Sequence, residues 1–222
     1  MDTIKQNIAE LRKFIPQTVD LVCVSKFHSV ESILQAYDCG ERLFGESRVK
    51  ELVRKYNDLP KDIKWHFIGH LQTNKVRQIV PFISLIHSVD SVELLQEINR
   101  CAAKNNRKIN VLLQVHIAQE EHKFGFMSDA LISFCEDFDF EKYPFINICG
   151  LMGMATFTDD EEQIKKEFLL LSNLFLELKS KCIFDVESFQ ILSMGMSDDF
   201  PLAIKLGSTM VRVGSSIFGE RY

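Results

Sequence analysis

A lysine that ends an apolar strand is the first residue of this chain whose type and position suggest covalent chemistry. Lys26 follows the run LVCVS, which is apolar and β-branched. At the rim of an apolar wall a lysine loses part of its hydration, which lowers its pKa and frees the amine to form a Schiff base with a carbonyl compound. A lysine that extends its ammonium group into solvent is the commoner arrangement at such a position. Lys26 alone therefore does not establish a site.

Two segments near the C-terminus, MGMS and RVGSSIFG, suggest a site for an anion. Gly214 would let the backbone approach an anion closely, and the amides of Ser215 and Ser216 would point at it from the start of a helix. Ser197 would add a hydroxyl group from the neighbouring loop. Ordinary turns made of small residues explain the two segments equally well.

An arginine precedes this glycine by two residues inside a strand. Strand alternation places Arg212 on the same face as Gly214, so its side chain should point inward, where a guanidinium needs a partner. If that partner is a pyridine nitrogen, the permanent positive charge disfavours protonation of the ring and weakens it as an electron sink. A structural ion pair with an inward-facing acid such as Glu46 is the alternative. The residues themselves leave both possibilities open.

The elements that must position these residues form a regular alternation of short apolar runs with segments of helical period. The runs are DLVCVS, RLFGE, WHFIG, SLIHSV, INVLLQVHI, NICGLMGMA, FQILSMGM and TMVRVG. Eight strands alternating with helices predict a parallel α/β fold closed as a (β/α)₈ TIM barrel, in a single domain over residues 1–222. The leading helix TIKQNIAELRKFI should fill the gap in the outer ring. In such barrels the site lies at the C-terminal ends of the strands, where Lys26, Ser197 and Gly214 are expected.

Several helix boundaries carry their own signals. Ser29 should cap a helix, and Asp90 with Glu93 three residues later should form a capping box. Pro201 in the first turn and Gly207 just after the last turn should bracket a third helix. The apolar stripe of the first of these helices should be Val30, Ile33, Leu34 and Tyr37.

Composition excludes several classes of protein. With a net charge of −5 and scattered basic residues, we expect no nucleic-acid partner. The six cysteines include no CxxC pair and are expected to be reduced. The N-terminus is charged throughout and no apolar run is long enough to cross a bilayer, so we expect a cytoplasmic protein with no membrane partner. His66 and His70 bracket the end of a strand, which argues against a zinc site, and we expect no metal.

Several motifs run in order through nearly the whole chain. They are LVCVSKFH, LFGES, WHFIGHLQTNK, IHSVDS, GLMGMA, LSMGMSDDF and GSTMVRVGSSIFGERY. Together they resemble the pyridoxal phosphate homeostasis protein family, the YggS/PROSC type. The fold of that family is similar to the N-terminal barrel of alanine racemase, which makes it a fold-type III protein that binds pyridoxal 5′-phosphate (PLP).

The resemblance implies a set of cofactor contacts. Lys26 carries PLP as a Schiff base, Ser197, Gly214 and Ser215 hold its phosphate, Arg212 faces its pyridine nitrogen, and Met154 packs against the ring where the racemase stacks a histidine. Two positions depart from the family pattern, because Ser47 stands where asparagine is usual and His70 where proline is common.

The same resemblance bears on function. Alanine racemase needs a second base from a β-rich domain, and this chain ends at Tyr222 directly after the last strand. We therefore expect a PLP carrier or buffer that passes PLP to apo PLP-dependent enzymes, acts as a monomer and is not itself an efficient enzyme. The alternatives are a free-standing amino-acid racemase and, without PLP, a barrel enzyme acting on a phosphorylated sugar.

Overall fold

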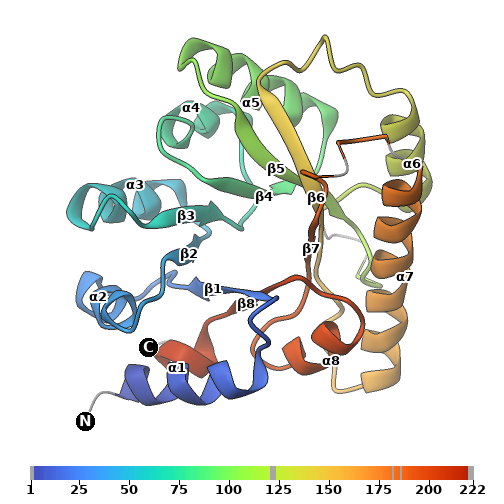
Figure 1. Cartoon of the computed structure of the whole chain (residues 1–222). Coiled ribbons are helices and arrows are strands. Elements are labelled where there is room, and N and C mark those ends of the chain that lie inside the picture. Colours follow the sequence, from blue (N-terminus) through green and yellow to red (C-terminus); the bar gives the residue numbers. More distant parts are fainter. Residues whose placement is uncertain (1–2, 121–123, 182, 186, 220–222) are drawn as a thin grey trace.

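The strands of the protein close into a barrel. The computed structural model describes residues 3–120, 124–181, 183–185 and 187–219 (Figure 1). Its strands are β1 (Asp20–Val24), β2 (Leu43–Glu46), β3 (Lys64–Phe67), β4 (Leu85–Val89), β5 (Ile109–Val115), β6 (Ile146–Gly153), β7 (Ile191–Ser193) and β8 (Met210–Val213). Each strand pairs in parallel with the next one along the chain, and β8 pairs with β1. This confirms the predicted (β/α)₈ TIM barrel.

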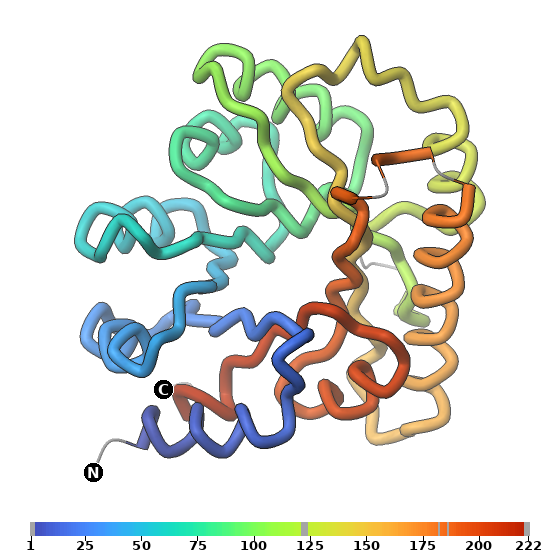
Figure 2. The backbone as a smooth tube through the Cα atoms, in the orientation of Figure 1, coloured from blue at the N-terminus to red at the C-terminus, as the bar shows by residue number. Residues whose placement is uncertain are grey.

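The helices lie outside the strands (Figure 1). They are α1 (Thr3–Phe14), α2 (Val30–Asp38), α3 (Val49–Asp58), the 3₁₀ helix η1 (Thr73–Lys75), α4 (Val76–Ile79), α5 (Val92–Lys104), α6 (Ser128–Glu136), α7 (Glu161–Ser180), α8 (Phe200–Lys205) and α9 (Ser215–Phe218). Figure 2 shows the first helix, in blue, beside the last, in red. The Asn7 side-chain amide donates to the carbonyl oxygen of Ile217 at 2.9 Å, so α1 closes the outer ring next to α9 as predicted.

Apolar side chains fill two separate regions, one inside the barrel and one between the strands and the helices. Alternation along β1 shows the division, because Val22 faces the interior while Cys23 packs under the helices. The inner cluster is Val22, Leu85, Leu112, Cys149, Met152 and Met210. Because side chains fill the barrel interior, a ligand site is expected at the ends of the strands.

Most of the predicted helix boundaries are confirmed. Ser29 caps α2, where its hydroxyl accepts from the Ser32 amide at 3.3 Å. Pro201 lies in the first turn of α8, and Gly207 follows the helix with a φ of +99°. The stripe predicted for α2 is wrong at Leu34, which is 36% exposed. The buried position is Ala36, because Leu34 is rotated by about 100° from the buried Ile33 around the helix axis.

The capping box predicted at Asp90 is wrong. The N-cap of α5 is Ser91, whose hydroxyl accepts from the Leu94 amide at 3.3 Å. The Asp90 carboxylate lies 3.0 Å from Nδ1 of His70, which comes from the loop after β3. Because the Asp90 carboxylate pairs with His70, it does not cap the helix, and Ser91 does so instead.

Two further predictions concern membranes and cysteines. Within the described ranges no helix combines the length and the apolar character that crossing a bilayer requires. Cys23, Cys101, Cys135 and Cys149 are free thiols, as expected. The sixth cysteine, at position 182, lies outside the described residues.

Candidate functional site

The residues predicted to contact a cofactor meet at one cavity. It has a volume of about 170 Å³ and opens at the C-terminal ends of β1, β6, β7 and β8. Its lining includes all six predicted residues: Lys26, Met154, Ser197, Arg212, Gly214 and Ser215. Residues from positions 26 to 215 are thus brought together, as the closure of the barrel requires.

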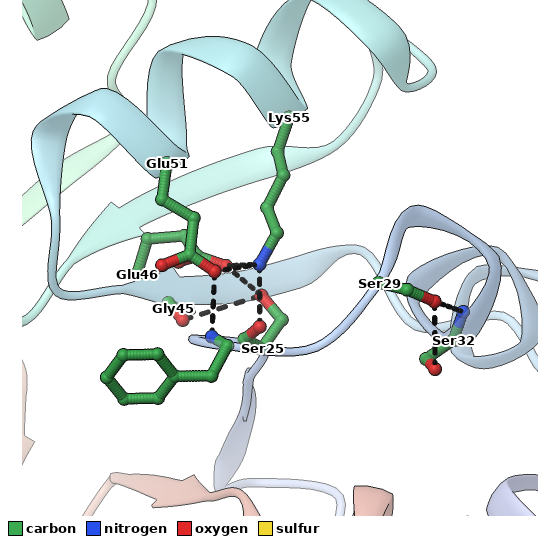
Figure 3. A network of polar contacts seen from close by, with 8 residues as sticks. Ser25, Ser29, Ser32, Gly45, Glu46, Glu51 and Lys55 are labelled. Carbon is green, nitrogen blue, oxygen red and sulfur yellow. Dashed lines mark hydrogen bonds and ion pairs between the residues drawn. The ribbon is translucent and has the colours of Figure 1, made fainter. Parts of the chain in front are cut away.

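The segment that carries Lys26 is held by a buried ion cluster, Lys55–Glu46–Glu51 (Figure 3). The Lys55 side chain is fully buried and its ammonium group donates to three oxygens, each at 2.7 Å. These oxygens belong to the carboxylates of Glu46 and Glu51 and to the backbone carbonyl of Ser25. The residue before Lys26 is therefore fixed to helix α3.

The residue after Lys26 is fixed by the same cluster. The Phe27 amide donates to the Glu51 carboxylate at 2.7 Å. Phe27 has a φ of +70°, a left-handed backbone conformation that residues other than glycine rarely adopt. Because the ion cluster holds the backbone on both sides, Lys26 leaves the end of β1 in a defined direction.

Burial and ion pairing shift the pKa values of the two acids of this cluster in opposite directions. Burial raises the pKa of Glu46, although Lys55 and the Ser25 hydroxyl favour its carboxylate form. Burial also acts to raise the pKa of Glu51, but hydrogen bonds from Lys55 and the Phe27 amide outweigh it and lower that pKa. The Oε2 atom of Glu46 is buried and has no hydrogen-bond partner among the described residues.

Arg212 points into the barrel as predicted, but the ion pair with Glu46 is wrong. Gly45 occupies the inward position of β2, where a Cβ would approach Val22 to 3.0 Å. Glu46 is therefore on the outer face of the strand and pairs with Lys55.

The guanidinium of Arg212 is instead held by neutral acceptors. Nη1 donates to Oγ of Ser193 at 2.6 Å, and Nη2 donates to the carbonyl oxygen of Gly153 at 3.0 Å. Burial lowers the pKa of Arg212 to about 10, with the charge of Asp199 acting against the shift. The group remains a cation at neutral pH.

Two histidines continue this arrangement through the barrel interior. Nδ1 of His87 lies 3.1 Å from Oγ of Ser193, and Nε2 of His87 lies 3.0 Å from Nδ1 of His66. Burial lowers the pKa of His66 to about 3 and that of His87 well below its ordinary value. The sequence analysis considered His66 only as a zinc ligand, which it rejected, and overlooked His87. Strand alternation was the available signal, because each histidine occupies an inward position of a buried strand.

The predicted anion-binding end of the cavity joins the last two strands. The Gly214 amide donates to the hydroxyl of Ser197 at 3.2 Å, which ties the loop after β7 to the end of β8. A Cβ on Gly214 would lie 3.2 Å from the carbonyl oxygen of Val24, so a glycine permits this close approach. The amides of Ser215 and Ser216 begin α9 and donate no hydrogen bond within the described part of the chain. These open donors fit a phosphate group.

The two departures from the family pattern lie outside the lining of the cavity. Ser47 packs against Gly69 and is not part of the lining. His70 pairs with Asp90 and stacks on Phe124 with 3.8 Å between ring centroids. Neither residue adds a group to the cavity.

The lining also contains residues that sequence reasoning did not single out. They are Val24, Ile68, Phe157, Met196 and Asp198. Val24 could have been found, because strand alternation places it on the same inward face of β1 as Val22. Phe157 lies in the loop between β6 and α7, where no periodic pattern indicates direction.

Comparison with known proteins identifies the relatives of this chain. The family model for the alanine racemase N-terminal domain matches residues 1–222. The pyridoxal phosphate homeostasis protein of Schizosaccharomyces pombe is 35% identical over 229 residues, covering 100% of this chain and 94% of that protein.

Solved structures give the same result. PipY of Synechococcus elongatus, solved with PLP bound, has a TM-score of 0.87 and 34% identity over 97% of this chain and 100% of PipY. Alanine racemase of Clostridium difficile has a TM-score of 0.77 over 99% of this chain and 56% of the racemase, and at 16% identity it shows a shared fold. The chain thus belongs to the pyridoxal phosphate homeostasis proteins, a family built on the N-terminal domain of alanine racemase.

Proposed function

We propose that this chain binds PLP in the cavity at the barrel mouth, as a Schiff base on Lys26, and serves PLP homeostasis as a carrier or buffer. The observation that carries the proposal is the convergence of Lys26, Arg212 and the open amide of Ser215 at the start of α9 on one cavity. The PLP-bound relative of the same family supports it.

Each of the six predicted residues has a role suited to its chemistry. Bound PLP would supply a reactive aldehyde, which the Lys26 amine would hold through a C=N bond formed with loss of one water molecule and reversed by addition of water. Ser197, Gly214 and Ser215 would hold the phosphate. Arg212 would donate toward the pyridine nitrogen and keep the ring unprotonated. Met154 would give the ring an apolar contact.

The lining favours a carrier over a racemase. Racemisation requires a base on each face of the reacting carbon, and Lys26 would provide one. None of the described lining residues is a tyrosine or a histidine. Asp198, the carboxylate of this lining, follows Ser197 directly and so belongs to the phosphate end. Reversible attachment at Lys26 would release PLP to apo PLP-dependent enzymes in the cytoplasm, with residues 1–222 acting as one monomeric domain.

The binding proposal is tested by absorbance spectra before and after PLP is added. We expect a new band from the Schiff base, and borohydride reduction followed by peptide mapping should label Lys26. Lys26→Ala should lose both signals. Lys205→Ala is the matched control, because Lys205 lines an adjoining cavity that shares Phe157, Met196 and Asp198 with this one. A band that persists in Lys26→Ala would refute the assignment.

The carrier proposal is tested separately. The loaded protein should restore activity to an apo PLP-dependent enzyme, and D/L-alanine interconversion by the loaded protein should stay at background. Clear turnover of alanine in the second assay would refute the carrier proposal and favour the racemase alternative.

A further inference from the structure

We infer that Ser193 and His87 are positioning residues for Arg212: with His66 they form a hydrogen-bonded chain inside the barrel that sets how the guanidinium faces the cofactor cavity. The inference rests on the proposed binding of PLP. Ser193, His87 and His66 do not line the cavity, so their effect on the cofactor would pass through Arg212.

The chain has a single direction of donation. A guanidinium can only donate, so Oγ of Ser193 accepts from Arg212. Among the described contacts of Ser193 Oγ, Nδ1 of His87, 3.1 Å away, is the one that can accept the hydroxyl proton. With the proton in that direction, His87 carries its own proton on Nε2, which donates to Nδ1 of His66 at 3.0 Å. The inferred chain thus has both histidines protonated on Nε2.

The chain carries no second charge. His87 is fully buried and His66 is 4% exposed, so both imidazoles are kept neutral by desolvation. The positive charge of Arg212 acts on His87 in the same direction. At neutral pH the charge within this chain is therefore located on the guanidinium.

Neutral partners leave the charge of Arg212 available to a ligand. The two described acceptors of Arg212 are a hydroxyl and a backbone carbonyl, and Asp199 acts on it only by a longer-range interaction. A carboxylate in direct contact would have compensated the charge. Contacts on β7 and β6 fix the plane of the guanidinium at two points, and its other N–H groups remain for the cavity that it lines.

The acceptor role of His87 explains why the chain extends beyond Ser193. A serine hydroxyl without an acceptor for its proton is free to rotate, and its lone pairs are then not held toward Arg212. The bond to Nδ1 of His87 removes this freedom, and hydrogen bonds in such a chain strengthen one another. His66 ends the chain and should contribute less than His87.

The test compares Ser193→Ala with Ser208→Ala. Ser208 is a matched control, because it is also a buried serine whose hydroxyl bonds to backbone carbonyls of the β7–β8 region, without contacting Arg212. PLP is titrated into each variant while absorbance is recorded. We expect Ser193→Ala to weaken PLP binding about tenfold, the equivalent of about 1.4 kcal/mol. It should also shift the band of the bound cofactor, whereas Ser208→Ala should change affinity less than twofold and leave the band in place.

Two variants of His87 separate positioning from packing. His87→Asn keeps an acceptor near the Nδ1 position and should retain PLP affinity within about threefold, whereas His87→Leu should lose about fivefold or more and shift the band. If Leu and Asn variants bind equally, or if Ser193→Ala and Ser208→Ala behave alike, the inference is refuted while Lys26 labelling in the unchanged protein still supports the proposed function. If the unchanged protein shows no Lys26 label, the proposed function fails.

A measurement on the unchanged protein does not depend on whether the variants fold. Nitrogen-15 chemical shifts of the histidine rings should show His87 neutral at pH 7 with its proton on Nε2. A proton on Nδ1 would contradict the direction of the chain.

Discussion

The two basic residues of the cavity, Lys26 and Arg212, are supported from opposite sides of the barrel wall in different ways. Behind Lys26, on the outer face, the Lys55–Glu46–Glu51 cluster holds the backbone with full charges. Behind Arg212, on the inner face, Ser193 and two neutral histidines hold a side chain with hydrogen bonds alone.

This difference separates stability from site chemistry. Removing one partner from a buried ion cluster leaves an uncompensated charge in an apolar region, which strongly destabilises the folded state. Removing one member of a neutral chain costs about 1 kcal/mol of net hydrogen-bond energy and leaves the charge where it was. We therefore expect the outer cluster to control folding and the inner chain to control how the cofactor is held.

The largest effect is expected at Lys55. Lys55→Met removes the cation from Glu46 and Glu51 and should lower the free energy of unfolding by about 3–5 kcal/mol. Urea denaturation followed by circular dichroism measures the change. Lys13→Met is the control, because the Lys13–Glu10 pair is exposed and should contribute almost nothing. Equal losses in the two variants would show that burial of the cluster does not matter.

Glu51 should affect both stability and binding. Glu51→Ala removes the acceptor of the Phe27 amide, and the lost charge-assisted hydrogen bond should cost about 2 kcal/mol. PLP affinity should fall severalfold, because the backbone after Lys26 is released. Glu51→Gln keeps an acceptor oxygen, so its PLP affinity should lie between that of the unchanged protein and that of Glu51→Ala. If Gln and Ala variants match, the contact with Phe27 does not position Lys26.

The inner chain should give the protein a pH dependence in the range where histidine titrates. His66 and His87 have folded pKa values below the ordinary value, so their contribution to stability is fully present above pH 6.5 and is lost as the pH falls. As the pH falls from about 6.5 to about 5.5, protonation of these two histidines in the unfolded chain should lower the free energy of unfolding by about 2 kcal/mol. Denaturation at the two pH values measures this, and His87→Leu should remove about half of the change.

The outer cluster should show little net pH dependence by comparison. The pKa of Glu46 is raised, so its contribution is lost as the pH rises, whereas the pKa of Glu51 is lowered, so its contribution is lost as the pH falls. The two trends oppose each other near the ordinary pKa of a glutamate. In the unchanged protein, the free energy of unfolding should therefore change less near that pH than it does in the histidine range. A larger change there would contradict this comparison.

The barrel and the strand-end residues could be predicted from the sequence because they depend on local pattern. Eight apolar runs determine the fold, and alternation within β8 gives the direction of Arg212. The supports could not be predicted, because they depend on how elements pack. Lys55 lies in the polar-looking segment VKELVRKYND and is buried only because α3 covers the outward Glu46. Asp90 and Ser91 are both good caps by residue type, and a contact with His70 from another loop decided between them.

The smallest effect is expected at Met154, which lines the cavity beside the inner apolar cluster. Met154→Ala removes apolar contact but moves no charge, so PLP affinity should fall about threefold, with Met154→Leu almost unchanged. Neither substitution should shift the absorbance band of bound PLP, in contrast to Ser193→Ala. A band shift in Met154→Ala would mean that the band responds to packing against the ring as well as to Arg212, and the band would then no longer separate charge positioning from contact.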